Sequence, residues 1–215
     1  MPHSFRLGPA DLQARPSGAL FWPAQGLLCV SDLHLGKSER LARRGGGLLP
    51  PYETPATLER LDAELEATGA RQVVCLGDSF DDLAAAEALD EADRLWLVRM
   101  MAGRMWHWIE GNHDPGPVDL GGSLRAELPL GGLIFRHQAG GDGFEVSGHF
   151  HPKVRLAGQS RRCFLTDGQR LILPAFGAYT GGLRVEAPAL QALMSPGARA
   201  IVTGPRCLVM PMPRC

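Results

Sequence analysis

The chain has 215 residues, of which 45% are hydrophobic and 21% charged, and its formal net charge is −1 at pH 7. These values are typical of a globular domain, and they exclude a low-complexity chain and a strongly basic nucleic-acid binder. The first 30 residues lack the apolar core of a signal peptide, and no apolar run reaches the roughly 18 residues of a membrane span. The length suits a single domain over residues 1–215.

The number and spacing of the cysteines indicate the cellular compartment of the protein. The chain has five cysteines, an odd number, and none of them forms a CxxC pair. Cys29 and Cys75 lie inside apolar runs, where we interpret them as small buried hydrophobic residues. We therefore expect a cytoplasmic protein without membrane contact.

Strand-length apolar runs alternate with helical stretches in the first half of the chain. The predicted strands are ALFW (19–22), LLCVSD (27–32), QVVCLGD (72–78), MWHWIEG (105–111) and LIFRH (133–137). Between them, leucine spacing predicts a helix over 55–68, with Thr54 as N-cap and Gly69 as stop, and a second helical stretch over 82–102 in two pieces. Strand–helix–strand order predicts an α/β fold with a mostly parallel core.

After residue 130 the pattern changes to short strands separated by turns. The predicted strands are FEVSGH (144–149), RRCFLTDG (161–168), QRLILPAF (169–176), LRVEA (183–187), RAIVTG (199–204) and RCLVMP (206–211). The Asp–Gly pair at 167–168 predicts a hairpin turn.

Polar side chains with metal-binding or proton-transferring groups follow five of the predicted strands. They are Asp32 and His34, then Asp78, then Asn112, His113 and Asp114, then His137, and finally His149 and His151. Binding sites in open α/β sheets lie at the carboxyl ends of the strands, so these residues are expected to converge. On an extended backbone the two i, i+2 pairs would each point to one side of the chain.

The types of side chain indicate the kind of metal site. Carboxylates, imidazoles and an amide, with no thiolate, suit Mn²⁺, Fe²⁺ or Zn²⁺ with positions open to water. Seven candidate ligands are too many for one tetrahedral ion and suit two divalent ions that share a bridging carboxylate. Paired ions of this kind stabilise the attacking and leaving oxygens in phosphate-ester hydrolysis.

The same motifs resemble the calcineurin-like metallophosphoesterase family. The family pattern appears as DLH (32–34), GDSFD (77–81), GNHD (111–114), His137 and GHFH (148–151). The resemblance implies two packed mixed β-sheets flanked by helices, in four αββα layers. It also implies an attack on phosphorus by a hydroxide that bridges the two metals.

The resemblance further implies roles for individual residues. Asp32, His34 and His151 would hold one metal, Asn112, His137 and His149 the other, and Asp78 would bridge them. His113 would not be a ligand but would neutralise the phosphoryl group or protonate the leaving oxygen. Asp114 would orient His113 as a carboxylate partner.

Within the family, the chain is similar to the bacterial ligase-associated DNA damage response phosphoesterases, the PdeM group. The stretches GDSFDD (77–82), SGHFHP (147–152), RRCFL (161–165) and LPAFGAYTGGL (173–183) carry this similarity. It implies a cytoplasmic, Mn²⁺-preferring phosphoesterase or DNA endonuclease. Such an enzyme would work in DNA repair beside an ATP-dependent DNA ligase and a helicase.

Three residues are candidates for substrate binding. Arg43 and Arg44 follow the DLH motif and are able to grip phosphate oxygens, and Tyr179 offers a stacking face to a base. A solvated helix face and a packed turn are the structural alternatives. For the pair Arg161 and Arg162, we favour the structural interpretation.

Two other functions compete with nucleic-acid hydrolysis. The first is a small-molecule phosphodiesterase or a nucleotide pyrophosphatase with the same chemistry, but the pyrophosphatase resemblance would show Arg where His113 stands. The second is a non-catalytic scaffold on the same fold, and such scaffolds tend to lose ligands, whereas all seven are present here. The oligomeric state stays open.

Overall fold

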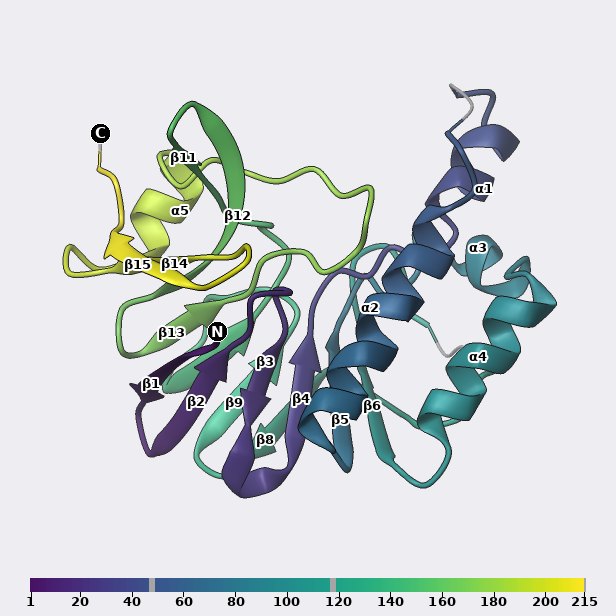
Figure 1. Cartoon of the computed structure of the whole chain (residues 1–215), viewed down its shortest axis with the longest axis horizontal. Coiled ribbons are helices and arrows are strands. Elements are labelled where there is room, and N and C mark those ends of the chain that lie inside the picture. The colour runs from purple at the N-terminus through teal and green to yellow at the C-terminus, as the bar shows by residue number, and fades with distance from the viewer. Residues whose placement is uncertain (47–48, 117–118, 215) are drawn as a thin grey trace.

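The computed structural model describes residues 1–46, 49–116 and 119–214. Within these residues the first sheet has seven strands in chain order (Figure 1). They are β1 (His3–Leu7), β2 (Ala10–Ala14), β3 (Leu20–Trp22), β4 (Leu27–Val30), β5 (Gln72–Leu76), β6 (Met105–Ile109) and β7 (Ser123–Arg125). Strands β1 to β4 pair antiparallel and β4 to β7 pair parallel, so the carboxyl ends of β4, β5 and β6 meet at one edge.

The second sheet is also mixed. Its strands are β8 (Glu127–Leu130), β9 (Leu133–Arg136), β10 (Phe144–Ser147), β11 (Lys153–Leu156), β12 (Gln159–Thr166), β13 (Arg170–Ile172), β14 (Arg199–Val202) and β15 (Leu208–Pro211). Their order is β15-β14-β12-β13-β10-β9-β8, with β11 beside β12. Strands β9, β10 and β13 run parallel, and the other pairs are antiparallel.

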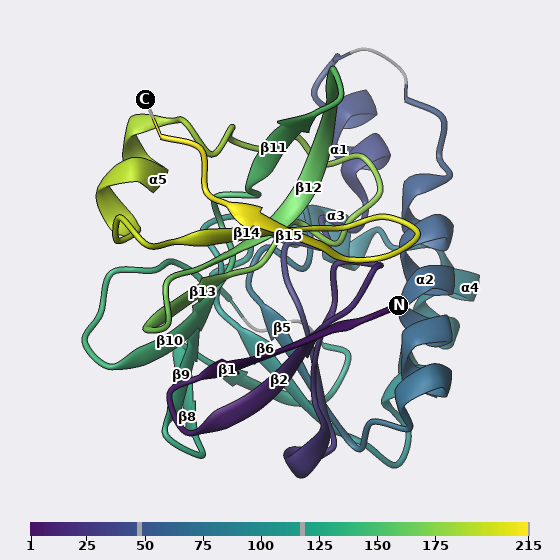
Figure 2. The same ribbon diagram turned by 60° about the vertical axis from the view of Figure 1, so that its left-hand side comes forward.

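Helices cover the outer faces of both sheets. They are α1 (Lys37–Arg43), α2 (Glu53–Thr68), α3 (Leu83–Glu87), α4 (Glu91–Met101) and α5 (Pro188–Leu193), with a short 3-10 turn, η1, at Pro23–Gln25. Helices α2 and α4 lie against the first sheet, and α5 lies on the far side of the second (Figures 1 and 2).

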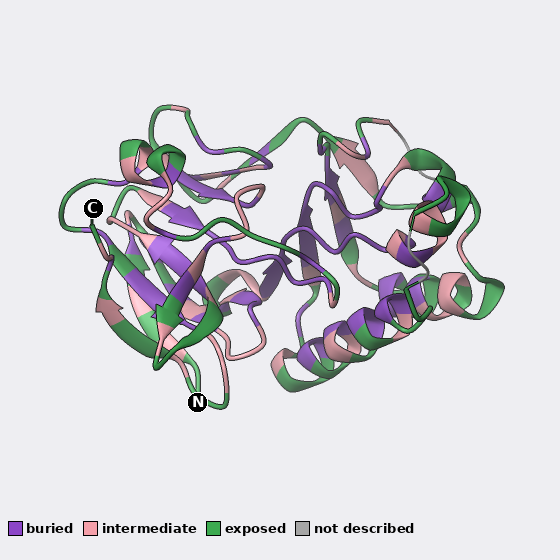
Figure 3. Ribbon diagram, turned by 90° about the horizontal axis from the view of Figure 1, so that it is seen from above, coloured by how far each residue is buried: buried purple, intermediate pink, exposed green. Residues whose placement is uncertain are grey.

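Three apolar clusters separate the layers, and strand alternation explains them. In β4, Leu28 and Val30 face the helices, whereas Leu27 and Cys29 face the second sheet. The third cluster packs α5 onto the second sheet. Figure 3 shows the buried strands lying between more exposed helices and loops. The predicted architecture, two mixed sheets flanked by helices in four αββα layers, is confirmed.

Several predicted elements have different bounds. Helix α2 begins at Glu53 rather than Pro55, and its N-cap position is Tyr52, with no side-chain cap. The hydroxyl of Thr54 instead accepts a hydrogen bond from the Gly36 amide, at 2.9 Å. The predicted N-cap was therefore wrong, because Thr54 joins α2 to the turn before α1.

The predicted strand at 183–187 was also wrong. Arg184 makes only an isolated bridge to Lys153, and the chain enters α5 at Pro188. By contrast, the turn at 167–168 does close a hairpin between β12 and β13, since the Arg170 carbonyl accepts from the Asp167 amide. The helical stretch over 82–102 is confirmed in two pieces, α3 and α4.

Among the described residues, no helix is both long enough and apolar enough to cross a bilayer. The four described cysteines, Cys29, Cys75, Cys163 and Cys207, are all free. Burial raises the pKa of the Cys75 thiol, and the Asp114 carboxylate adds to the shift, so this thiol stays protonated as a core residue.

Candidate metal centre

Strand ends from both sheets meet at one place. Asp32, Asp78 and Asn112 follow β4, β5 and β6 of the first sheet, while His137 and His149 follow β9 and β10 of the second. Within each sheet the parallel register brings these carboxyl ends to one edge, at the upper ends of the strands in Figure 1. The expected convergence is present.

The side chains form two compact groups, and each group takes residues from both sheets. Asp32, His34 and His151 have ligand atoms that all lie within 4.8 Å of one another. Asp78, His137 and His149 form a second such group. These groups match the two sets that the motifs implied, with Asp78 placed in the second.

Asn112 belongs with the second group. Its Oδ1 lies 2.9 Å from His137 Nε2 and 2.9 Å from His149 Nδ1. Asp78 Oδ2 lies 3.5 Å from His137 Nε2 and 4.0 Å from His34 Nε2, so this carboxylate lies between the two groups. Its position suits a ligand shared by two ions.

Two imidazoles are held through Nδ1, which directs Nε2 toward the ligand groups. Asp81 Oδ1 binds His34 Nδ1 at 2.8 Å, which leaves His34 Nε2 buried with no hydrogen-bond partner in the described chain. The Leu76 carbonyl similarly accepts from His137 Nδ1 at 2.8 Å and leaves Nε2 facing Asn112 and Asp78. Metal-ligating histidines are held in this way through their other ring nitrogen, so the donor set fits divalent ions.

The backbone at these residues is unusual. Asp32, His34, Asp78, His149 and His151 all have positive φ, between 46° and 68°. Ala157 is the one other non-glycine residue of this kind in the described chain. A left-handed conformation costs an L-residue about 1–2 kcal/mol, and such strain gathers at functional sites.

These φ values correct the reasoning from i, i+2 spacing. Strands β4 and β10 end at Val30 and Ser147, so neither Asp32 and His34 nor His149 and His151 lie on an extended backbone. The left-handed turns, rather than strand alternation, direct each pair to its group.

Close approach explains two motif glycines. A Cβ on Gly111 would lie 2.3 Å from Asp78 Oδ1, and one on Gly148 would lie 2.5 Å from Asp32 Oδ2. Only glycine lets these loops pass so close to the carboxylates.

His113 faces the two groups without belonging to either of them, and it forms a third cluster with His34 and Asp81. Its Nε2 lies 4.0 Å from Asp78 Oδ2, and its side chain is 30% exposed. Its Nδ1 is 2.8 Å from the Asp81 carbonyl oxygen. This geometry directs Nε2 toward Asp78, which lies between the two groups.

Asp114 does not orient His113, so that expectation was wrong. Its buried carboxylate accepts hydrogen bonds from the amides of Asp78, Ser79 and Phe80, at 2.9, 2.7 and 3.1 Å. Burial raises the pKa of Asp114 to about 6, against the lowering effect of these amide donors. The residue holds the turn that carries Asp78, a contact that the adjacency of His113 and Asp114 in sequence does not reveal.

Asp81 is a functional candidate to which the motif pattern assigned no role. Burial would raise the pKa of its carboxyl, but hydrogen bonds from His34 and Arg40 hold that pKa far below the ordinary value. Its side chain fixes His34, and its carbonyl contacts His113. In the sequence, Asp81 is the second aspartate of the GDSFD motif, and that position was the signal that could have identified it.

Charge and burial shift the pKa values of Asp32 and His149 toward the forms that bind metal. Burial opposes ionisation of Asp32, yet its contacts with His151 and His137 leave its pKa below the ordinary value. Burial lowers the pKa of His149, and His137 adds to the effect. A carboxylate and a neutral imidazole are the forms required of ligands.

The candidate substrate residues differ from expectation. The guanidinium of Arg43 binds Glu39 at 2.9 Å and both oxygens of Asp82 at 2.8 and 2.9 Å. Arg44 also contacts Asp82, at 3.3 Å. The guanidinium of Arg43 is therefore not free to bind a phosphate. To bind substrate, it would first have to break its contacts with Glu39 and Asp82.

Tyr179 lies in the segment between β13 and α5, which crosses the upper edge of the sheets in Figure 1, and is 37% exposed. Within this segment, the amides of Phe176 and Gly177 donate to the carbonyls of Ser31 and Asp32, at 2.7 and 3.1 Å. Phe176 is fully buried, so the segment is a packed wall beside the centre, as the packed-turn alternative predicted.

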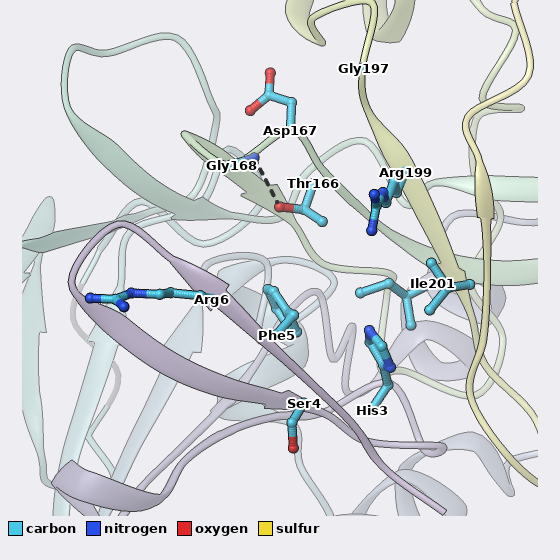
Figure 4. Close-up of a pocket in the computed structure, with 11 residues that line it drawn as sticks. His3, Ser4, Phe5, Arg6, Thr166, Asp167, Gly168, Gly197, Arg199 and Ile201 are labelled. Carbon is cyan, nitrogen blue, oxygen red and sulfur yellow. Dashed lines mark hydrogen bonds between the residues drawn. The ribbon is translucent and has the colours of Figure 1, made fainter.

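A groove of about 460 Å³ lies elsewhere, between the sheets' edges (Figure 4). Residues of β1, His3 to Arg6, line one side, and the turn at 166–168 and β14 line the other. The amide of Gly168 donates to the Thr166 hydroxyl at 3.4 Å, an internal contact of the turn. None of the candidate ligands lines this groove.

A comparison with solved structures finds a nuclease of similar fold. No protein-family model matches the chain, and no curated protein does. The crystal structure of Pseudomonas putida nuclease MPE is similar, with a TM-score of 0.77 and 29% sequence identity. The alignment covers 98% of this chain and 100% of that chain. The similarity therefore includes both sheets and the loops that carry the candidate ligands.

Proposed function

We propose that the chain is a metal-dependent phosphoesterase that hydrolyses phosphodiester bonds in nucleic acid. The observation that carries the proposal is the pair of ligand groups at one edge, where buried His34 Nε2 has no partner in the described chain. The similarity to a nuclease over nearly the whole chain supports nucleic acid as substrate.

Two divalent ions fit the donor set. Asp32, His34 and His151 would hold one ion, Asn112, His137 and His149 the other, and Asp78 both. Bound there, they would supply Lewis acidity and a nucleophile that is active at neutral pH. The oxygen and nitrogen ligands suit Mn²⁺, which we propose as the working metal, with Fe²⁺ or Zn²⁺ as substitutes.

The protein's own groups complete the site. His113 presents Nε2 toward the centre, where it would neutralise a phosphoryl oxygen or protonate the leaving oxygen. Asp81 holds His34 and His113 in place, and Asp114 fixes the turn that bears Asp78. Arg44 and Tyr179 remain proposed substrate contacts at the rim.

The test compares a small diester with a polynucleotide. Bis(p-nitrophenyl) phosphate and circular single-stranded DNA are incubated with Mn²⁺ or with chelator, using wild-type protein and the His113→Ala variant. We expect Mn²⁺ to support both reactions and the substitution to impair both. If only the small diester is hydrolysed, the phosphoesterase activity is supported and nucleic acid is rejected as the substrate. Hydrolysis in the presence of chelator would refute metal dependence.

The motif similarity supports a cellular setting as well. We propose cytoplasmic work in DNA repair beside an ATP-dependent DNA ligase and a helicase, and the four free cysteines agree with a reducing compartment. Co-purification of the tagged chain with either partner after DNA damage would support this setting. If neither partner co-purifies with the tagged chain, direct association is contradicted.

A further inference from the structure

Three arginines line a pocket next to the candidate metal centre. The pocket has a volume of about 370 Å³, and six of its lining residues carry polar side chains: Ser17, Arg60, Ser160, Arg161, Arg162 and Thr203. It lies between α2 and the hairpin β11–β12, which projects from the second sheet in Figures 1 and 2. No described carboxylate lines it.

Among the described residues, no carboxylate forms an ion pair with Arg60. Its Nε and Nη2 are buried and make no hydrogen bond within the described chain. The guanidinium lies over the ring of Phe176, with its central carbon 4.4 Å from the ring centroid. Glu64, one turn further along α2, is engaged by Arg15 at 2.7 Å. A cation in this position is stabilised when an anion enters the pocket.

A second guanidinium adds to the positive charge. Arg162 donates to the carbonyls of Gly177 and Ala178, at 2.6 and 3.2 Å, and to the Thr180 hydroxyl at 2.9 Å. These partners are neutral, so the charge of Arg162 is solvated but not cancelled. Burial lowers the pKa of Arg60 to about 10, and the charge of Arg162 contributes.

One residue, Gly177, contacts both an arginine of the pocket and a candidate metal ligand. The carbonyl of Gly177 accepts from Arg162, and its amide donates to the carbonyl of Asp32, at 3.1 Å. An anion held by the arginines would therefore lie one loop away from the ligand groups. Arg161 also lines a neighbouring groove with Arg206, and Ser160 lines another with Arg155, so the positive surface continues along the hairpin.

We propose that this arginine pocket binds a backbone phosphate of a nucleic-acid strand whose scissile phosphate lies at the metal centre. The inference rests on the proposed function and adds to it a second contact, remote from the chemistry. Arginines with hydroxyl neighbours suit phosphate oxygens and carry no base specificity. Arg162 keeps the structural role that the sequence indicated, since it donates hydrogen bonds to Gly177, Ala178 and Thr180. The proposal adds phosphate binding to Arg162 and to Arg161.

The experiment measures binding without catalysis. The full-length chain is titrated into a labelled single-stranded oligonucleotide in the presence of chelator, and fluorescence anisotropy gives Kd over a range of salt concentrations. Arg161→Gln and Arg60→Gln are compared with wild type. Arg6→Gln, an exposed arginine of β1 whose Nε donates to the Gly8 carbonyl, is the matched control.

We expect each pocket variant to weaken binding by roughly three- to ten-fold, for any base sequence. The slope of log K against log salt should fall by about 0.7 for each phosphate that the variant no longer neutralises. Arg161 is exposed, so its variant tests the proposal even if Arg60→Gln disturbs packing on Phe176. Affinities equal to those of Arg6→Gln would overturn the proposal.

Competition separates a strand from a free phosphate. Inorganic phosphate and a nucleoside monophosphate are added to the same titration. If either displaces the oligonucleotide with an affinity matching the strand's own, the pocket is a site for free phosphate and the proposal fails. The proposed function is judged separately, by hydrolysis of bis(p-nitrophenyl) phosphate with Mn²⁺, so the two failures are distinguishable.

Discussion

The orientation of each imidazole decides which nitrogen is available at the centre. His34 and His137 are both held through Nδ1, by the Asp81 carboxylate and the Leu76 carbonyl. Their Nε2 atoms are thus aimed before any ion arrives, which lowers the ordering cost of metal binding. His113 is held through Nδ1 in the same way, yet it lies outside the group around Asp32.

Replacing His113 tests its separate role. We expect His113→Ala to lower kcat by about 10²–10⁴ because the site then has no proton donor or cationic partner at this position. Metal content should stay unchanged, as measured by elemental analysis of the purified protein. A fall in metal content would instead make His113 a ligand.

Asn112 and His149 are predicted to serve the same ion. We expect Asn112→Ala and His149→Ala each to reduce bound metal from about two ions per chain toward one. The matched control is His107→Ala, because His107 is not one of the candidate ligands. Its Nδ1 lies 2.8 Å from the Ser123 hydroxyl. Two retained ions with full activity would disprove the assignment.

At the scale of elements, short turns after the strands position the ligands. Gly148 begins the turn that carries His149, and a Cβ there would also clash with the Ser31 hydroxyl oxygen, 1.7 Å away. Gly181 is a suitable reference, since a Cβ on it meets no atom within 4 Å.

We therefore expect Gly148→Ala to lower the free energy of unfolding by about 1–3 kcal/mol, since the overpacked turn must shift. Metal content should fall with it, because the turn carries His149. Gly181→Ala should change stability by less than about 0.5 kcal/mol. Urea denaturation of both variants checks this, and equal stabilities would contradict the packing argument.

Apolar runs were sufficient to predict β4, β5, β6 and β10, because buried strands read directly as hydrophobic sequence. They missed β1 and β2, where apolar and polar residues alternate, so that neither strand forms a continuous apolar run. They also misassigned 183–187, where Val185 is buried as part of a loop.

The convergence of the candidate ligands was predictable from motif order, but their geometry was not. Left-handed backbone at Asp32 or His151 has no propensity signal in a non-glycine residue, since tertiary contacts impose it. The contacts of Asp114 and the pairing of Arg43 with Asp82 likewise depend on segments far apart in sequence.

At the scale of the whole molecule, metal binding at the candidate centre would be linked to folding. An ion that binds only the folded chain stabilises it by about 2.7 kcal/mol at a concentration of 100 Kd. For a chain of this length we expect Mn²⁺ to raise Tm by roughly 5–10 °C.

Calorimetry with and without chelator checks the shift. His107→Ala should retain it, and His137→Ala should show a much smaller one, since His137 contacts both Asn112 and Asp78. An unchanged Tm in saturating Mn²⁺ would show that the groups do not bind the ion.

Each candidate ligand group combines residues from both sheets, so it is complete only after most of the chain has been synthesised. Asp32 and His34 leave the ribosome more than a hundred residues before His151, and Asp78 precedes His137 and His149. A nascent or prematurely terminated chain therefore carries only part of either group. On the proposed function, catalytic competence would arise only in the completed molecule, and an unfinished copy would be harmless to nucleic acid.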